Sequence, residues 1–182
     1  NGVDIKCSNS APIYVVNADK TVIDLKDGSN NTITDGENYV FEDTSSEESN
    51  SAIYSKDDLT ISGNGTLTVN GNYNNGIVSK DDLKITGGNI TVTAVNNGIK
   101  GKDSVRIKDG NIKVTAGGDG IKTNNSKETE KGYIYIAGGT IDITSEQDGI
   151  QADTTVLIKD GDIKITSGGG SENAVSKNND KD

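Results

Sequence analysis

The chain has 182 residues, a formal net charge of −10 and 30% hydrophobic residues, with one Cys and no Trp, Met or His. This acidic balance argues against nucleic acid as a partner, because binding phosphates requires a basic face. The single Cys7 excludes a disulfide within the chain, and no apolar run approaches the ~20 residues that span a membrane.

Alternating apolar residues predict short strands from the N-terminus onward. Val3 and Ile5 form one such pair, Ile23 and Leu25 form a second, and Ile33 marks a third strand. The first pair is spaced like the last strand of a coil whose earlier part is absent. We therefore expect the chain to begin in mid-coil.

Residues 35–50 interrupt this alternation with an irregular polar stretch. We expect an exposed acidic loop, which Tyr39, Val40 and Phe41 attach to the body of the domain. The acidic residues of this stretch are Glu37, Glu42, Asp43, Glu47 and Glu48.

Residues 73–116 contain one 22-residue sequence written twice. Ile77 recurs as Ile99, and Leu83 recurs as Val105. Within a unit the apolar residues stand in pairs two positions apart, which is typical of strands with one buried face. Asn-Gly, Asp-Asp and Gly-Gly pairs separate them as turn signals. Each unit is therefore predicted to form three short strands and three turns.

Such a unit cannot bury its own apolar face, so successive units must stack at about 4.8 Å. The sequence thus predicts an all-β fold, a parallel β-helix with coils of about 22 residues, as one domain over residues 1–182. The strongest anchor positions of the stacked coils are Ile53, Ile77, Ile99, Ile121 and Ile150.

The C-terminal coils depart from the repeat in length. The segment SKETEKG between Asn125 and Tyr133 is an insertion at a turn, where solenoids tolerate extra residues. The polar tail, residues 176–182, is expected to fray. The final coil should place four residues inward, namely Val156, Ile158, Ile163 and Ile165.

Acidic residues fall at one turn of successive coils, and stacking should bring them together. Carboxylates repeated at one coil spacing repel one another, and Ca²⁺, with about six to eight oxygen ligands, would relieve the repulsion. Mg²⁺ suits such a site less well because it demands a strict octahedron, and Zn²⁺ would require His or Cys. The candidate calcium ligands of this turn are Asp57, Asp58, Asp81, Asp82, Asp103 and, one residue out of step, Asp153.

A second oxygen-rich column precedes the isoleucine anchors, and a Gly follows each of its members. Its residues are Asn75, Asn97, Asp119 and Asp148, which we also predict as calcium ligands. The alternative is that Asp and Asn before Gly are ordinary turn residues. Asn75 and Asn97 are neutral where Asp would be a stronger ligand.

Lysines are in register too, with Lys80 and Lys102 just before the acidic turn and Lys100 and Lys122 just after isoleucine anchors. These four residues are candidates for binding sugar carboxylates. The alternative is a solvated face in which Lys pairs with the Asp column. The tyrosines that could provide aromatic platforms for sugars are Tyr14, Tyr54, Tyr133 and Tyr135.

Four motifs carry a family resemblance: NNGIVSKDDL at 74–83, GIKGKDS at 98–104, GGDGIK at 117–122 and GYIYI at 132–136. Together they resemble the bacterial calcium-dependent carbohydrate-binding family with a polysaccharide-lyase-like β-helix. The resemblance covers nearly the whole chain. It implies a right-handed parallel β-helix, secreted or held at the cell surface, that binds calcium and plant cell-wall polysaccharides, notably acidic polygalacturonate (pectin) and also cellulose.

The resemblance implies binding rather than cleavage, and a calcium-dependent lyase acting on uronate polymers by β-elimination is the alternative. A lyase needs a base with a shifted pKa. The sole Arg106 is expected to point outward, in register with Lys84 and Tyr135, and no Lys departs from its row. We therefore predict a non-catalytic binding module.

Overall fold

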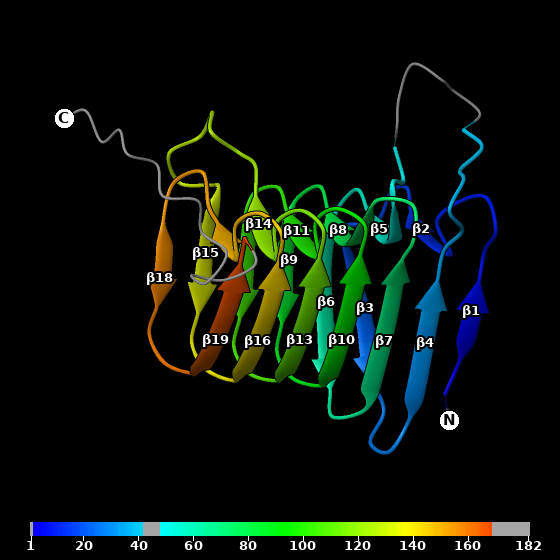
Figure 1. Cartoon of the computed structure of the whole chain (residues 1–182), viewed down its shortest axis with the longest axis horizontal. Helices are drawn as coiled ribbons and strands as arrows, with labels where there is room; N and C mark the ends of the chain where they lie inside the picture. The colour runs from blue at the N-terminus through cyan, green and yellow to red at the C-terminus, as the bar shows by residue number, and fades with distance from the viewer. Residues whose placement is uncertain (1, 42–47, 169–182) are drawn as a thin grey trace.

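The computed structural model describes residues 2–41 and 48–168, which form β-strands joined by turns and loops. Each coil contributes one strand to each of three parallel sheets, and the coils stack along one axis as a parallel β-helix (Figure 1). The predicted all-β solenoid is therefore confirmed. Among the described residues, no helix has the length and hydropathy needed to cross a bilayer.

The three sheets are named A, B and C. Sheet A has seven strands, β1 (Asp4–Lys6), β4 (Asn30–Thr34), β7 (Thr66–Gly71), β10 (Asn89–Ala94), β13 (Asn111–Ala116), β16 (Thr140–Ser145) and β19 (Asp162–Ser167). Sheet B has six strands, β2 (Ile13–Val15), β5 (Ser51–Ser55), β8 (Asn75–Ser79), β11 (Ile99–Gly101), β14 (Ile121–Thr123) and β17 (Ile150–Gln151). Sheet C also has six, β3 (Lys20–Leu25), β6 (Asp58–Gly63), β9 (Asp82–Ile85), β12 (Ser104–Ile107), β15 (Tyr133–Ile136) and β18 (Val156–Ile158).

The register between coils follows the repeat in the sequence. Ile99 pairs with Ile77 on one side and with Ile121 on the other, as the anchor series predicts. At the N-terminal end, Ile13 pairs with Ile53 across a longer stretch of chain that contains the irregular polar segment. A single coil length therefore describes only the central coils.

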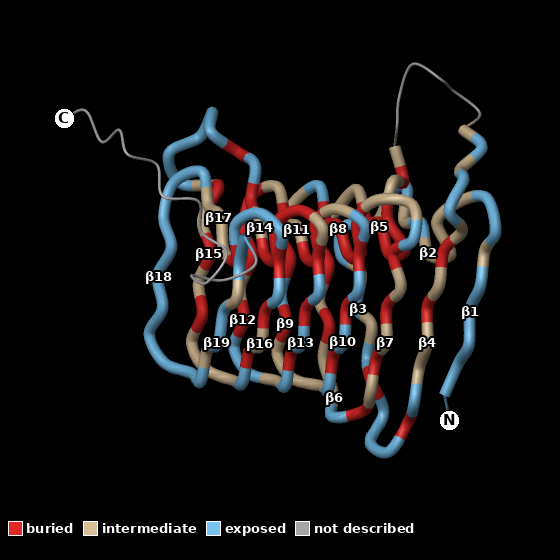
Figure 2. The backbone as a smooth tube through the Cα atoms, in the orientation of Figure 1, coloured by how far each residue is buried: buried red, intermediate tan, exposed pale blue. Residues whose placement is uncertain are grey.

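The core is a stack of inward-pointing aliphatic side chains, which appears as alternating buried positions along strands such as β7, β10 and β13 (Figure 2). Leu83 and Ile85 of sheet C are fully buried, and so are Ile77 of sheet B and Val92 of sheet A. Fully burying one such side chain contributes about 1.5–3 kcal/mol. Because every coil repeats these positions, each core residue packs on its counterparts above and below.

The glycines after the Asn/Asp column are required by space and not by backbone conformation. A Cβ on Gly98 would lie 2.3 Å from Cγ1 of Val114 and 2.8 Å from the carbonyl oxygen of Gly120. Gly98 does not have a positive φ. The Asn-Gly pairs read as turn signals therefore mark a close approach between sheets A and B, and Asn75 and Gly76 lie within β8.

The expected acidic loop is only partly exposed. Asp35 is 3% exposed, and its carboxylate accepts hydrogen bonds from the Tyr39 hydroxyl at 2.7 Å and the Asn72 backbone amide at 2.5 Å. Val40, expected to attach this segment to the body, is 72% exposed. The Tyr39 ring instead stacks on Tyr73 with centroids 4.2 Å apart. Residues Glu42, Asp43 and Glu47 and the tail at 176–182 lie outside the described residues.

The last described coil pairs in the predicted register, with Val156 opposite Ile134 and Ile165 opposite Ile143. Its aliphatic side chains are nevertheless more exposed than expected: Val156 is 44% and Ile165 42% exposed. These residues cover the preceding coil, and no described strand packs on their other side. All four predicted residues therefore take the inward register, but this coil buries them less than the central coils bury their counterparts.

Replacing Gly98 by Ala tests the close approach of sheets A and B. We expect Gly98→Ala to destabilise the fold by about 1–3 kcal/mol, since the new methyl group overpacks a filled site. Chemical denaturation followed by far-UV circular dichroism measures this change.

The matched control is Thr93→Ala, because Thr93 is an exposed position of β10. That substitution should change the stability by no more than about 0.5 kcal/mol. Equal stabilities of the two variants would refute a steric role for the glycine column.

Candidate functional site

Sheet B carries an open pocket of about 260 Å³ on its outer surface. Tyr54, Val78 and Lys100 occupy paired positions of β5, β8 and β11, where they alternate with the inward isoleucines. In Figure 1 this sheet lies at the top of the molecule, beside the raised segment that joins β14 to β15. The pocket is lined by Glu48, Asn50, Tyr54, Asn75, Val78, Ser79, Lys80, Lys100 and Asn124.

The four candidate lysines divide into two pairs. Lys122 forms an ion pair with Asp119 at 2.5 Å, and Lys102 lies 3.8 Å from a carboxylate oxygen of Asp103. Lys80 and Lys100 line the pocket, and within residues 2–41 and 48–168 neither has a carboxylate oxygen within 4.0 Å. The structure therefore leaves the ammonium groups of Lys80 and Lys100 available to a ligand.

Lys100 also differs electrostatically from the other lysines. Burial lowers the pKa of Lys100, and the positive charges of Lys122 and Lys80 lower it further. The sequence-based expectation that no Lys departs from its row is therefore wrong. The sequence does not show this difference, because the burial of Lys100 depends on which segments flank sheet B in the folded protein.

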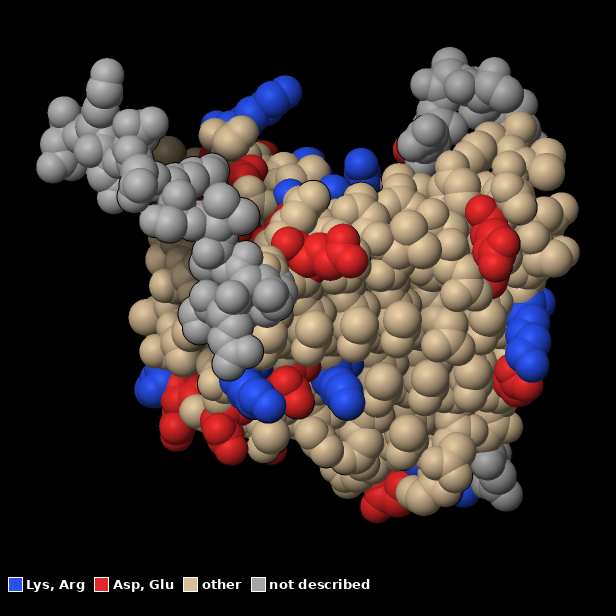
Figure 3. Space-filling view, viewed as in Figure 1, with Lys and Arg blue, Asp and Glu red and all other residues tan. Residues whose placement is uncertain are grey.

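Charge is unevenly spread over the surface. Figure 3 shows basic side chains projecting from the upper margin of the molecule, where sheet B lies, while much of the visible front face formed by sheet A is uncharged. The chain as a whole carries a net charge of −10. Basic side chains also lie along the lower margin and at the right-hand end of this view. Those near sheet B would attract an anionic ligand.

The candidate tyrosines separate in space. Tyr14 and Tyr54 lie on adjacent strands of sheet B with an edge-to-face contact of 5.6 Å between ring centroids. Tyr54 is 2% exposed and lines the pocket, whereas Tyr14 is 40% exposed. Tyr133 and Tyr135 lie on β15 in sheet C. Of these four, only Tyr14 presents an exposed ring on sheet B, while Tyr54 borders the pocket as a nearly fully buried residue.

The acidic turn column lies between sheets B and C, as the spacing predicts. Asp82 pairs with Ser104 across β9 and β12, and the backbone amide of Asp103 donates to the carbonyl oxygen of Asp81 at 3.2 Å. Asp57 binds elsewhere, since its carboxylate accepts a hydrogen bond from the backbone amide of Ala18 at 2.7 Å. Asp58 stays in the column, because its Oδ1 accepts a hydrogen bond from the backbone amide of Asp82 at 3.2 Å. The column therefore comes together at Asp58, Asp81, Asp82 and Asp103.

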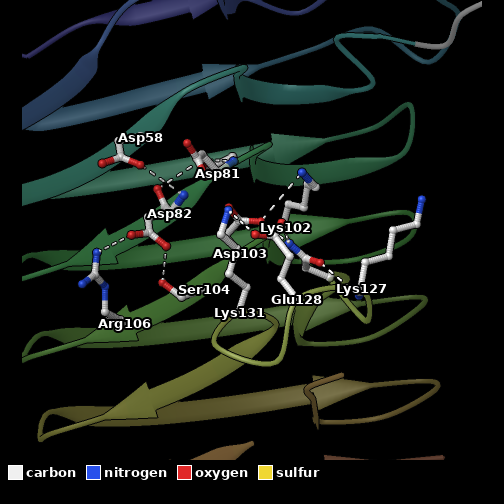
Figure 4. A network of polar contacts seen from close by, with 12 residues as sticks. Asp58, Asp81, Asp82, Lys102, Asp103, Ser104, Arg106, Lys127, Glu128 and Lys131 are labelled. Atoms are coloured by element: carbon white, nitrogen blue, oxygen red, sulfur yellow. Dashed lines mark hydrogen bonds and ion pairs between the residues drawn. The ribbon is translucent and has the colours of Figure 1, made fainter. Parts of the chain in front are cut away.

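Two of these carboxylates already have cationic partners (Figure 4). Nη2 of Arg106 lies 2.7 Å from Asp82, whose other oxygen accepts a hydrogen bond from the Ser104 hydroxyl at 2.7 Å. Nζ of Lys131 lies 2.8 Å from Asp103. The predicted register of Arg106 with Lys84 and Tyr135 is confirmed, but its ion pair with Asp82 was not foreseen.

Asp81 and Asp103 form a coupled pair of carboxyl groups. A hydrogen bond with Asp103, together with burial and the nearby charges of Asp103, Asp58 and Asp82, raises the pKa of Asp81 to about 6. Burial also raises the pKa of Asp103, but hydrogen bonds from Asp81, Lys131 and Asn125 outweigh it and hold that pKa at about 2. Burial and the neighbouring carboxylates thus disfavour the ionised form of Asp81.

The Asn/Asp column forms a hydrogen-bonded ladder, of which Asn75 lines the pocket. Oδ1 of Asn75 accepts from the backbone amide of Asn97 at 3.3 Å and from its side-chain amide at 2.8 Å. Oδ1 of Asn97 accepts from the Asp119 amide at 3.2 Å, and Oδ1 of Asp119 accepts from the Asp148 amide at 3.0 Å. Each of these oxygens thus satisfies a backbone donor of the next coil.

These contacts decide how well the predicted calcium ligands fit. In the described part of the chain, no three acidic, His or Cys residues are close enough together to hold a metal ion. The side-chain oxygens of the Asn ladder are already engaged, and Asp148 and Asp153 are exposed. Asp81 and Asp103 come nearest to such a site, but Lys131 and Asn125 already engage the carboxylate of Asp103, so that of the two only Asp81 has no cationic partner among the described residues.

Sequence reasoning missed two groups of residues. Glu48, Val78 and Asn124 help to line the pocket, but they belong to no conspicuous column. Lys131 lies in the insertion and therefore has no counterpart in the repeat. The insertion itself was a usable signal, since extra residues at one turn of a solenoid are able to reach the neighbouring coil.

Comparisons with known proteins agree with this fold. Over residues 1–182 the chain matches the family model of carbohydrate-binding domain-containing proteins. A carbohydrate-binding domain-containing protein of Acetivibrio thermocellus is 54% identical over 94 residues, which are 52% of this chain and 33% of that protein. The chain thus spans about a third of the length of this curated relative. A solved polysaccharide lyase-like protein from C. thermocellum, a gadolinium derivative, matches with a TM-score of 0.91 and 53% identity over 94% of this chain and 69% of that one.

Replacing Asn97 by Asp tests whether this residue stabilises the hydrogen-bonded ladder or binds a metal ion. The ladder predicts that Asn97→Asp destabilises the fold by about 1–3 kcal/mol, because the donor to Asn75 is lost and two oxygens face each other. The loss should be the same in calcium and in excess chelator, as thermal unfolding would show. If residue 97 were a calcium ligand, the added carboxylate would bind calcium more strongly. Calcium would then raise the thermal midpoint of Asn97→Asp more than that of the unmodified protein.

Asn111→Asp is the control for this measurement. Asn111 is exposed at the start of β13, so the same chemical change there should leave the thermal midpoint nearly unaltered.

Proposed function

This chain belongs to the family of carbohydrate-binding domain-containing proteins, and on that basis we propose that it binds an acidic polysaccharide in the pocket on sheet B without cleaving it. The proposal rests on one observation. Lys80 and Lys100 line the pocket, and the described residues offer them no carboxylate partner. A polymer of uronate sugars such as polygalacturonate presents the carboxylates that these ammonium groups lack.

The geometry of sheet B suits an extended polymer. Successive strands lie about 4.8 Å apart, so the pocket offers similar positions repeated along the axis of the solenoid. Tyr54 and Tyr14 continue the row of Lys100 toward the N-terminal coils. An acidic chain lying along this row would meet charged groups at one end and aromatic rings at the other.

We also propose that calcium assists this binding, with Asp81 and Asp103 as the residues that would hold it. The backbone hydrogen bond from Asp103 to Asp81, which brings the two residues together, and the raised pKa of Asp81 support this assignment. Calcium would supply a positive charge that oxygen ligands of both protein and polysaccharide can share. Asp58 and Asp82 lie close enough to raise the pKa of Asp81 further.

Two further parts of the proposal follow from the resemblance of the sequence motifs. We propose that the protein acts outside the cell, secreted or at the cell surface, because plant cell-wall polymers are found there. We also propose binding to cellulose. Cellulose has no carboxylates, so its binding would not depend on the charges of Lys80 and Lys100.

A lyase is the second candidate function, and the lowered pKa of Lys100 favours it. A lowered pKa is what a lysine needs to act as a base at neutral pH. The base would remove the proton next to the uronate carboxylate, and the glycosidic oxygen would leave as a double bond forms. The fold similarity to a polysaccharide lyase-like protein leaves this activity open.

Retention on insoluble polygalacturonate tests the binding proposal. We expect Lys100→Met to weaken retention about tenfold, the effect of losing one charge-assisted contact of roughly 1.5 kcal/mol. Lys84→Met, an equal change of charge on an exposed position of β9, should have little effect. Raising the salt concentration should weaken the retention of the unmodified protein, since exposed charges are screened.

The same samples distinguish binding from cleavage. We expect no rise in the absorbance of unsaturated products during incubation with polygalacturonate and calcium. Steady product formation that Lys100→Met abolishes would replace the binding proposal with the lyase. Equal retention of the Lys100 and Lys84 variants would exclude the pocket as the binding site.

A calcium titration tests the metal assignment. The double variant Asp81→Asn/Asp103→Asn should bind calcium at least about tenfold more weakly than the unmodified protein, because the two carboxylates provide most of the local charge. The control Glu130→Gln/Glu146→Gln removes the same charge from exposed positions. An equal loss of calcium affinity in both variants would mean that calcium binding depends only on the overall charge of the protein.

A further inference from the structure

The pocket on sheet B has a carboxylate beside its two lysines. Among the described residues that line it with Lys80 and Lys100, Glu48 is the acidic one. Its side chain is 45% exposed, and it comes from the chain between β4 and β5, which lies outside the repeat. A carboxylate at this place opposes the binding of a second negative charge, so Glu48 bears on which ligand the pocket accepts.

Two groups of sheet B hold the Glu48 carboxylate. Nζ of Lys56 lies 2.5 Å from Oε2 of Glu48, and the Tyr14 hydroxyl donates to the same oxygen at 3.3 Å. The hydrogen bond from Lys56 lowers the pKa of Glu48 and outweighs the effect of burial, and Tyr14 and the charge of Lys80 lower that pKa further. Glu48 is therefore ionised at neutral pH, and its charge lies close enough to Lys80 to interact with it.

The backbone next to Glu48 fixes its position. Ser49 has a φ of 62°, and among the described residues it is the only one besides glycines with a positive φ. Such a conformation persists where the surrounding structure determines it. The anchor is Asn50, whose carbonyl oxygen accepts hydrogen bonds from the backbone amide of Asn75 at 3.2 Å and from its side-chain amide at 3.1 Å. The turn thus holds Glu48 at the pocket.

Lys56 stands one coil before Lys80 in the same column. The backbone amide of Lys80 donates to the carbonyl oxygen of Ser55 at 2.9 Å, and Ser55 pairs with Ser79. Adjacent coils lie about 4.8 Å apart. If Lys80 binds one carboxylate of a ligand, Lys56 is the cation in position for the next carboxylate toward the N-terminal coils. Glu48 already engages that cation.

We propose that Glu48 is a specificity-determining residue, whose carboxylate occupies a second carboxylate subsite formed by Lys56 and Tyr14. One uronate unit binds at Lys80 and Lys100. The neighbouring unit toward the N-terminal coils meets an ion pair in place of a free lysine, together with the ring of Tyr14, which is 40% exposed. A neutral unit fits there better than a second uronate.

The preferred ligand is therefore a uronate chain in which neutral units, such as methyl esters, interrupt the charged ones. This inference rests on the proposed binding of an acidic polysaccharide in the pocket, but not on the calcium assignment.

The test measures retention in excess chelator on two immobilised polymers, polygalacturonate and partly methyl-esterified polygalacturonate. We expect the unmodified protein to bind the esterified polymer at least about threefold more tightly. Glu48→Gln should bind polygalacturonate at least about fivefold more tightly than the unmodified protein, because Lys56 becomes available to a second carboxylate. Its affinity for the esterified polymer should change less than about twofold. The control Glu37→Gln removes the same charge from an exposed residue and should change both affinities less than about twofold.

A double-mutant cycle shows whether the gain comes from Lys56. Lys56→Met leaves Glu48 without its cation and should weaken retention on polygalacturonate about twofold to threefold. Glu48→Gln/Lys56→Met should be retained like the unmodified protein, since no cation becomes available. A gain in the double variant as large as that of Glu48→Gln would assign the effect to overall charge and overturn the role of Glu48. Both side chains are partly exposed, so we expect the variants to fold, which equal thermal midpoints would show.

The outcomes separate this inference from the proposed function. Equal retention of Glu48→Gln and Glu37→Gln on polygalacturonate, or equal retention of the unmodified protein on both polymers, would overturn the inference alone. Weaker retention of Glu48→Gln would also overturn it, and would make Glu48 an acceptor for sugar hydroxyl groups. In each of these cases Lys100→Met still tests the pocket as the binding site. Failure of every variant to bind either polymer would refute the binding proposal, and this inference with it.

Discussion

The structure depends on backbone hydrogen bonds between parallel coils, which hold each residue next to its counterpart one coil away. Paired isoleucines such as Ile77, Ile99 and Ile121 make the inner surface of this stack continuous. With only 30% hydrophobic residues, the chain cannot build a wide core. It uses its few aliphatic side chains in rows, so that each is covered by the coils on either side.

The same stacking creates an electrostatic problem that a globular fold would avoid. A carboxylate repeated at one turn is brought close to its copies, and burial strengthens the repulsion. The chain resolves this with different partners in different coils: Arg106 for Asp82, Lys131 for Asp103 and Lys122 for Asp119. These lysines and this arginine form ion pairs with carboxylates of the protein itself. Few basic groups therefore remain for a ligand.

This distribution explains why the surface of sheet B stands out. Lys80 and Lys100 line a pocket that also contains the aromatic ring of Tyr54. Asn75, which lines this pocket, belongs to the Asn ladder, whose oxygens bind the backbone of the next coil. Hydrogen bonds between coils thus support the pocket from one side. A preorganised surface of this kind lowers the cost of binding a ligand.

The solenoid, its strands and their register were predictable from the amino-acid sequence, because residues 73–116 repeat one pattern and stacked coils place equal positions side by side. The repeat also predicted that Asp81 and Asp103 share one column. Which charged groups lack a partner was not predictable, since that depends on contacts between coils that the repeat does not encode. Lys100 and Lys122 look alike in the sequence, yet Asp119 binds only Lys122. Asn97 looks like a turn residue or a metal ligand, but its neighbours in the next coils make it a rung of a hydrogen-bonded ladder.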